Sequence, residues 1–271
     1  MDVYRQFVGR YEDALRQSLP APDTNKAKTP LVVANAPVAL LFSPHPDDEV
    51  ITGALALRLQ QEVGARVVNV AVTLGSNAAR RDARRREVEN ACKILGWDLA
   101  VFGWESVTPE FAEHHPGGWQ SWISAVARVI QQQKPKWIFY PHAQDWHPTH
   151  RGVNKLVEAA LKHTGPAPAP VRILTEYWHP LANPNLLVEC APESLSKLVA
   201  ALCCHEGEVA RNPYHLTLPA WMADNVRRGG ERVAGPGQPA PKFPFGVLYR
   251  VEPDLPAGWE AISPTSKRLW A

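Results

Sequence analysis

Five apolar segments recur along the first two thirds of the chain, and segments with helical spacing separate them. The segments that we predict to be strands are 38–42, 66–75, 99–103, 137–142 and 172–178. Their residues are almost continuously apolar, which is typical of strands that are buried on both faces of a sheet. Between them, apolar residues recur at intervals of three and four, as at Val88, Ala91, Cys92 and Leu95, and so share one face of a helix.

This alternation of buried strands and amphipathic helices predicts a mostly parallel sheet with helices on both faces. We therefore expect a single-domain, Rossmann-like, doubly wound α/β fold with strand order 3-2-1-4-5 and a C-terminal decoration. Two of the helices are predicted over 48–63 and 80–95, each closed by a glycine.

The chain is expected to have three parts. They are 1–35, an N-terminal helix and a Pro-punctuated linker; 36–180, the α/β core; and 181–271, an extension packed on the same domain. Within the extension we predict a helix around 195–202 and a strand over 246–251. The Gly- and Pro-rich stretch 229–244 predicts a long surface loop.

Composition narrows the class of protein. A chain of 271 residues with 45% hydrophobic residues and a net charge of +2 can bury a sizeable core. The basic cluster RRDARRR (80–86) lies on a predicted helix and is followed by acids, so it indicates a solvated helix face and no nucleic-acid partner. No apolar run reaches the roughly 18 residues of a membrane span. Four cysteines without metal or redox spacing, and an N-terminus unlike a signal peptide, favour a cytoplasmic protein.

Two segments rich in ionisable residues follow predicted strands. SPHPDDE (43–49) follows the first strand and PHAQDWHPTH (141–150) follows the fourth. In the predicted strand order these strands are neighbours, so both segments meet at the switch point of the sheet. Adjacent carboxylates repel one another, and we expect them to share a cation with the histidines of the second segment.

Zinc binds imidazole and carboxylate, and its catalytic sites combine three protein ligands with a water. His45, Asp48 three residues later and a histidine of the second segment would supply such a set. Asp47, next to the ligand Asp48, would then hold the water and take its proton. Imidazole and carboxylate suit iron(II) as well as zinc, so both metals stay open.

HPDDE, followed about a hundred residues later by HPTH, resembles the motifs of the PIG-L/LmbE-like deacetylases. These are zinc-dependent hydrolases that remove acetyl groups from N-acetylglucosamine-type substrates. The resemblance implies His45, Asp48 and His150 as metal ligands, Asp47 as the base, and His147 as the residue that stabilises the tetrahedral intermediate as an imidazolium. It also implies that a zinc-bound water attacks the amide of a small amino-sugar conjugate, and it leaves open whether the protein is a homo-oligomer.

Further residues have secondary roles in this interpretation. Glu49 is expected to hold its loop or a ligand in place, and Arg84 matches a helix on which the family carries a substrate-binding arginine. Trp146 lies inside the second motif, where a flat ring suits a sugar face. His205, which follows the helix of the extension, is a candidate either for contacting substrate or for supporting the residues that do.

The second motif departs from the family at Thr149, where an aspartate often stands. A hydroxyl group cannot hold the negative charge that would tune the neighbouring histidine. We expect Asp145, two residues before His147, to take over part of this role.

A different class of function is a nucleotide-binding or a catalytically silent sugar-binding α/β protein. No G-x-G-x-x-G follows the first strand, and the carboxylates there would repel a phosphate. The presence of a complete set of ligands and a base argues against a silent relative.

Overall fold

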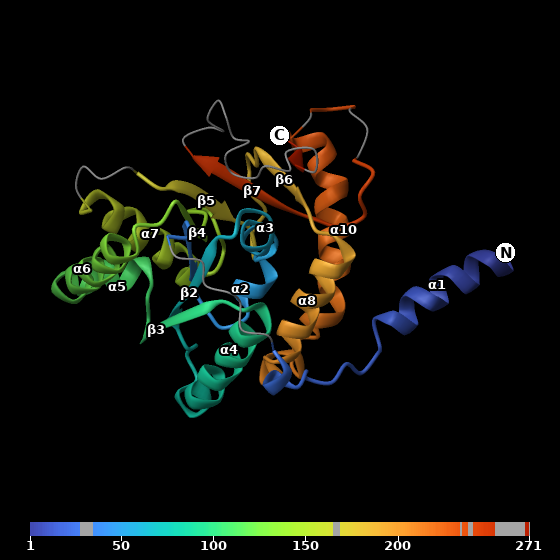
Figure 1. Cartoon of the computed structure of the whole chain (residues 1–271), viewed down its shortest axis with the longest axis horizontal. Helices are drawn as coiled ribbons and strands as arrows, with labels where there is room; N and C mark the ends of the chain where they lie inside the picture. Colours follow the sequence, from blue (N-terminus) through green and yellow to red (C-terminus); the bar gives the residue numbers. More distant parts are fainter. Residues whose placement is uncertain (28–34, 165–168, 234, 238–240, 253–268, 271) are drawn as a thin grey trace.

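One mixed sheet runs through the protein (Figure 1). The computed structural model describes residues 1–27, 35–164, 169–233, 235–237, 241–252 and 269–270. The strands are β1 (Val38–Ser43), β2 (Arg66–Thr73), β3 (Asp98–Trp104), β4 (Trp137–Pro141), β5 (Val171–Thr175), β6 (Leu186–Glu189), β7 (Gly246–Glu252) and β8 (Leu269–Trp270). Their order is β3-β2-β1-β4-β5-β7-β6-β8, in which β1 to β5 are parallel and the other three pair antiparallel. The predicted fold class and the order 3-2-1-4-5 are therefore confirmed.

Helices cover both faces of the sheet. On one face lie α2 (Asp48–Ile51), α3 (Ala54–Val63), α4 (Arg81–Leu95), α8 (Pro192–Cys203) and α10 (Tyr214–Val233). On the other lie α5 (Pro109–His114), α6 (Pro116–Gln133) and α7 (Pro148–Lys162). Strand residues alternate between the two cores, so that Leu41 packs on the first face while Leu40 and Phe42 pack on the second.

The remaining elements are short or lie at the edge of the molecule. They are α1 (Asp2–Ala14), η1 (Thr24–Lys26), η2 (Ala78–Arg80) and α9 (Glu206–Val209). The predicted N-terminal helix is present as α1, which projects from the body in Figure 1 and has no buried residue. Residues 28–34 of the predicted linker lie outside the described residues. None of the helices among the described residues is long and apolar enough to cross a membrane.

The helix predicted over 48–63 is divided in two by a contact from the far end of the chain. The phenol of Tyr249 on β7 donates to the carbonyl of Thr52 at 2.6 Å and accepts from the amide of Leu55 at 3.1 Å. These are groups that a continuous helix would pair internally. Gly53 fits the break because a Cβ there would lie 2.5 Å from the carbonyl oxygen of Glu49. The break separates α2, which directly follows the loop after β1, from α3.

The prediction of a loop over 229–244 is wrong for its first residues, because α10 continues to Val233. The sequence analysis did not anticipate α10. Its glycines serve close packing against the sheet, since a Cβ on Gly229 would lie 2.6 Å from the Leu187 side chain on β6. Residues 234 and 238–240 lie outside the described residues, whereas 246–251 form a strand as predicted.

The packing of α7 generates a prediction for stability. A Cβ on Gly152 would lie 2.1 Å from the carbonyl oxygen of Val107, and neither backbone can move freely. Gly152→Ala is expected to lower the free energy of unfolding by about 1–3 kcal/mol, although alanine favours a helix. Gly117→Ala in α6 is the control, because nothing lies within 4 Å of its Cβ position. Equal denaturation midpoints for the two variants would contradict this account.

Candidate metal centre and active site

The loop that follows β1 is held by hydrogen bonds to its own carboxylates. The backbone N–H of His45 donates to Asp48 Oδ2 at 2.8 Å, and that of Asp47 donates to Glu49 Oε2 at 2.9 Å. Asp47 has a φ of +113°, a value that residues with a side chain rarely adopt. This sharp turn lets Asp47 and Asp48 direct their carboxylates toward the same cavity, which both line.

The loop that follows β4 is arranged around Asp145. The Asp145 carboxylate is buried and accepts the backbone N–H of His147 at 2.8 Å through Oδ1 and that of Trp178 at 3.3 Å through Oδ2. His147 begins α7, where its Nδ1 accepts the backbone N–H of Thr149 at 3.2 Å. His150 therefore lies in the first turn of α7, facing the first loop.

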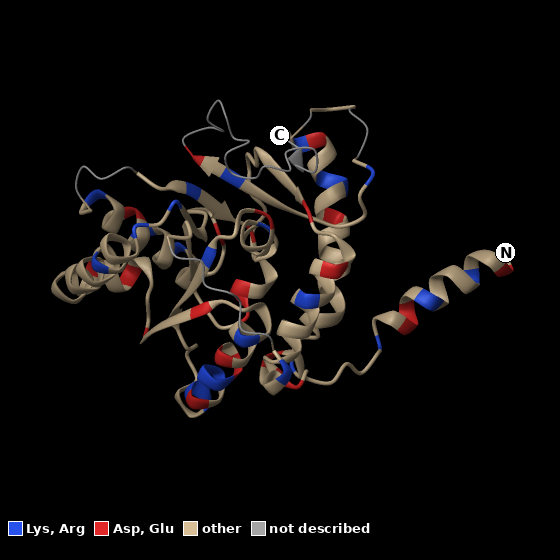
Figure 2. Ribbon diagram, viewed as in Figure 1, with Lys and Arg blue, Asp and Glu red and all other residues tan. Residues whose placement is uncertain are grey.

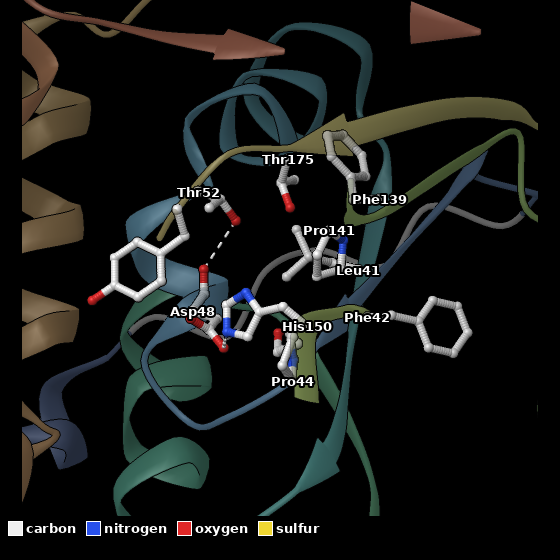
Figure 3. Close-up of a pocket in the computed structure, with 11 residues that line it drawn as sticks. Leu41, Phe42, Pro44, Asp48, Thr52, Phe139, Pro141, His150 and Thr175 are labelled. Atoms are coloured by element: carbon white, nitrogen blue, oxygen red, sulfur yellow. Dashed lines mark hydrogen bonds and ion pairs between the residues drawn. The ribbon is translucent and has the colours of Figure 1, made fainter. Parts of the chain in front are cut away.

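The two loops meet where β1 and β4 run side by side, as predicted (Figure 3). Asp48 Oδ2 lies 3.3 Å from His150 Nε2 and 3.3 Å from His45 Nδ1. On its other side, His150 Nδ1 lies 3.4 Å from Asp145 Oδ2. Nitrogen atoms of His45, His147 and His150 all lie within 4.8 Å of one another.

The donor set fits a divalent cation. Asp48 Oδ1 and both ring nitrogens of His150 are buried and have no partner with hydrogen-bond geometry among the described residues. In tetrahedral coordination by imidazole and carboxylate, ligand atoms lie about 3.3 Å apart, which is the spacing of Asp48 Oδ2 from both imidazoles. Asp145 would orient the ring of His150 from behind, an arrangement common in metal sites. His45, Asp48 and His150 can therefore hold the ion.

His147 belongs to the same cluster, but its Nδ1 already has a partner. Because its Nδ1 accepts a backbone N–H, the proton of the neutral ring lies on Nε2. Burial, with His45 and His150 nearby, lowers the pKa of His147 to about 4. The ring is therefore a neutral donor near pH 7 in the metal-free protein, whereas the family resemblance implies that it stabilises the intermediate as an imidazolium.

Burial and neighbouring charges set the other protonation states. Burial and the adjacent Asp48 carboxylate raise the pKa of Asp47 well above its usual range. Burial also opposes ionisation of Asp48, but the facing His150 and His45 outweigh it and lower the pKa of Asp48. Burial would lower the pKa of His150, but Asp48 and Asp145 outweigh it and raise the pKa to about 9.

Two cavities adjoin these residues. A space of about 10 Å³ lies beneath Asp48 and His150, among the ends of β1, β4 and β5 (Figure 3). An open cavity of about 470 Å³ lies above, and His45, Asp47, Asp48 and His147 form part of its lining. The larger cavity is wide enough for a sugar-sized ligand.

The residues expected to have secondary roles divide into two groups. Arg84 lines the larger cavity, and its Nη2 donates to the carbonyl of Pro46 at 2.9 Å. Glu49 and His205 are fully buried and contact each other, so of the two alternatives for His205 the structure excludes contact with the cavity and leaves a supporting role. Trp146 is 68% exposed, stacks on His179 and lies outside the cavity lining.

Other cavity residues were missed by the sequence analysis. Tyr177 and Trp178 follow β5, the strand next to β4, and a shorter prediction for that strand would have exposed them as site candidates. The rest of the missed lining includes Arg81, Glu105, Glu208, Arg211 and Tyr214. Figure 2 shows the basic residues of α4, and two of them line this cavity. The sequence analysis interpreted this face of the helix as solvated, but part of it therefore belongs to the cavity wall.

The second loop contains one histidine that the site does not use. His142 Nε2 lies 2.8 Å from the carbonyl oxygen of His179, and its Nδ1 accepts the N–H of Gln144 at 3.3 Å. Both contacts point the ring away from the metal-binding cluster.

Comparison with known proteins finds a family whose model includes both loops. Residues 40–161, which include both, match the family model described as PIG-L: GlcNAc-PI de-N-acetylase. A probable N-acetyl-alpha-D-glucosaminyl L-malate deacetylase 2 from Bacillus cereus is 28% identical over 147 residues, 49% of this chain. The alignment covers 64% of that relative, slightly less than two thirds of its length.

Solved structures share the fold over a longer stretch. The N,N'-diacetylchitobiose deacetylase from Pyrococcus horikoshii has a TM-score of 0.58 at 17% identity and covers 96% of this chain and 97% of its own. GalB, the 4-carboxy-2-hydroxymuconate hydratase from Pseudomonas putida, has a TM-score of 0.63 at 20% identity and covers 80% of this chain and 96% of its own. At these identities the likeness shows a common fold.

The site geometry predicts which variants lose metal. His45→Ala, Asp48→Ala and His150→Ala are each expected to lose most bound metal, because three protein ligands leave no spare donor. His142→Ala is the control, since it removes a buried histidine of the same loop that faces away. Elemental analysis of the purified variants gives the result. Full metal occupancy in one of the first three would remove that residue from the proposed ligand set.

Metal affinity is expected to depend on pH through His150. The ring must lose its proton to bind a cation, and its pKa is about 9 in the metal-free protein. The apparent Zn²⁺ association constant should therefore rise about tenfold per pH unit between pH 6 and 8. Competition with a chromophoric chelator measures this slope. Asp145→Asn should flatten it by lowering the pKa of His150, and a flat profile in the wild type would refute the explanation.

Proposed function

We propose that this chain, whose residues 40–161 match the PIG-L family model, is a metal-dependent deacetylase that hydrolyses the acetamido group of an N-acetylglucosamine-type substrate. One observation carries the proposal. Asp48 Oδ2 lies 3.3 Å from each of two imidazoles while its buried Oδ1 has no hydrogen-bond partner among the described residues, and a second carboxylate, Asp47, lines the same open cavity. The malate deacetylase relative acts on this class of sugar, which supports the choice of substrate.

His45, Asp48 and His150 would hold the cation, which we propose to be zinc. When bound, the ion supplies Lewis-acid polarisation of the amide carbonyl and lowers the pKa of the attacking water. Asp48 and His45 contribute positions that are already fixed, because the His45 N–H donates to the Asp48 carboxylate. Pre-fixed ligands reduce the ordering that binding would otherwise require.

Asp47 is the proposed general base. Its carboxylate lies next to that of Asp48 in the chain and takes the proton of the attacking water. Burial and Asp48 raise the pKa of Asp47, so the side chain can keep that proton and then deliver it to the leaving nitrogen. Water and amide are thereby converted to acetic acid and a free amine: one proton of the water passes through Asp47 to the leaving nitrogen, and the other stays on the new carboxyl group until solvent takes it.

His147 is the proposed stabiliser of the oxyanion. His147 lines the cavity, and because the backbone N–H of Thr149 occupies Nδ1, its neutral ring can donate through Nε2. A preorganised donor needs no positive charge to favour the negative charge that develops on the former carbonyl oxygen. Asp145 fixes the donor by accepting the backbone N–H of His147.

The walls of the cavity support a sugar substrate. Trp104, Trp178 and Tyr214 present aromatic surface, while Arg81 and Arg211 present guanidinium groups beside it. Aromatic faces suit the apolar faces of pyranose rings, and the polar groups can bind hydroxyl or acidic substituents.

The fold by itself does not choose the reaction, because a hydratase shares it. The assay must therefore detect the bond that breaks. A panel of N-acetylated amino sugars and their conjugates is incubated with the zinc-loaded protein, and free amine and acetate are measured together. Equal amounts of both products support deacetylation. A sugar that binds without releasing either product would point to the sugar-binding alternative.

Two substitutions separate catalysis from metal binding. Asp47→Asn is expected to keep its zinc and to lower kcat by roughly 10²–10⁴, because the base is lost while all three ligands remain. His147→Ala should also keep zinc and lower kcat by roughly 10²–10³ through the loss of one donor. His147→Gln can restore part of the rate, since its amide donates without a charge.

Zinc content and kcat are measured on the same preparations. As a further check, the fall in rate toward low pH, which reports protonation of Asp47, should be absent from the residual rate of Asp47→Asn. Loss of zinc in step with activity, in either variant, would reassign that residue to the ligand set.

A further inference from the structure

We infer that His205 and Glu49 form a buried positioning pair that keeps Asp47 in its strained conformation. This inference rests on the proposed function, in which Asp47 is the base. It gives a role in that reaction to a residue 156 positions away in the sequence, at the junction of α8 and α9.

The conformation of Asp47 requires outside support. Ser106 and Lys134 also have positive φ, at 53° and 47°, close to the left-handed region that side chains tolerate. Asp47, at φ +113° and ψ −33°, lies well beyond that region. Such a backbone persists only when the contacts around it over-determine it.

Glu49 provides that support through both of its oxygens. Oε2 accepts the backbone N–H of Asp47, the residue with the unusual φ, at 2.9 Å. Oε1 accepts from His205 Nε2 at 2.9 Å. Neither Glu49 nor His205 has any exposed surface, so water cannot replace either partner. Without His205, the carboxylate would be free to rotate about its side chain and release Asp47.

His205 is itself fixed by backbone contacts on both sides. Its N–H donates to the carbonyl of Leu202 at 2.9 Å in the last turn of α8, and its carbonyl accepts the N–H groups of Glu208 and Val209 at 2.9 Å in α9. The imidazole is therefore presented by two joined helices of the C-terminal part. Through the contact of His205 with Glu49, α8 and α9 restrain the loop after β1.

The metal ligands do not depend on this pair. The backbone of His45 is tied directly to the Asp48 carboxylate, and Asp145 holds His150 from the other loop. Removal of His205 should therefore misplace Asp47 while leaving the metal site intact. A general loss of stability would instead affect ligands and base together.

His205→Ala is expected to lower kcat by roughly 10- to 100-fold, with zinc content unchanged and KM within about twofold. His205→Gln should recover part of the loss, because its amide N–H can still donate to Glu49. His215→Ala is the matched control, since His215 is also buried, follows soon after in the chain, and does not line the cavity. Its kcat should stay within about twofold of the wild type.

A double-mutant cycle tests whether His205 acts through Asp47. In an Asp47→Asn background, His205→Ala should lower kcat no further, because the base that it positions is already absent. Losses that multiply, zinc that falls with kcat, or a His215→Ala variant that is equally slow would each overturn the proposal. If His205→Ala does not fold, His205→Gln and Glu49→Gln carry the same cycle.

Crystal structures of the wild type and of His205→Ala provide a readout that needs no substrate. We expect the φ of Asp47 to leave the positive range in the variant while His45, Asp48 and His150 keep their positions. A φ near +113° in both crystals would overturn the proposal whatever the kinetics. If the wild type releases no amine from any substrate, the proposed function fails, and the crystal comparison alone decides the role of the pair.

Discussion

The burial of two adjacent carboxylates, Asp47 and Asp48, is the constraint around which the rest of the site is organised. Removing two like charges from water is costly unless each finds a compensating partner. Asp48 is compensated by imidazoles from two loops, and the charge of Arg84 favours the ionised form of Asp47. Each compensating group comes from a different element, so the sheet and its helices must assemble before the pair can be buried.

The strongest part of the sequence-based prediction concerned features repeated along the chain. Parallel strands such as β1 and β4 have uniform apolar patterns, and the topology of such sheets directs the loops after them to one place. Both ligand-bearing loops could therefore be located without coordinates. Asp145 was also identified correctly as a neighbour of the histidines, because it shares their loop.

The C-terminal part was harder to predict, for a physical reason. The path of α10 depends on packing against β6, where the glycines that indicate a loop in the sequence permit close approach. The break between α2 and α3 depends on Tyr249, which lies almost two hundred residues further along the chain. The sequence could not decide whether His205 lines the pocket or supports it, because its hydrogen bond with Glu49 joins residues far apart in the chain. Such contacts leave no local pattern in the sequence.

The contact between Tyr249 and the start of α3 has a consequence for the biosynthesis of the protein. The phenol replaces backbone partners at the break between α2 and α3, and β7, which carries it, is made well after both loops. A nascent chain that has emerged from the ribosome only as far as α7 would contain both loops with the candidate ligands but would lack the contact made by Tyr249. The parallel half of the sheet can form early. The first loop would then reach its final shape only after β7 has also emerged, which separates synthesis of the candidate ligands from completion of the site that holds them.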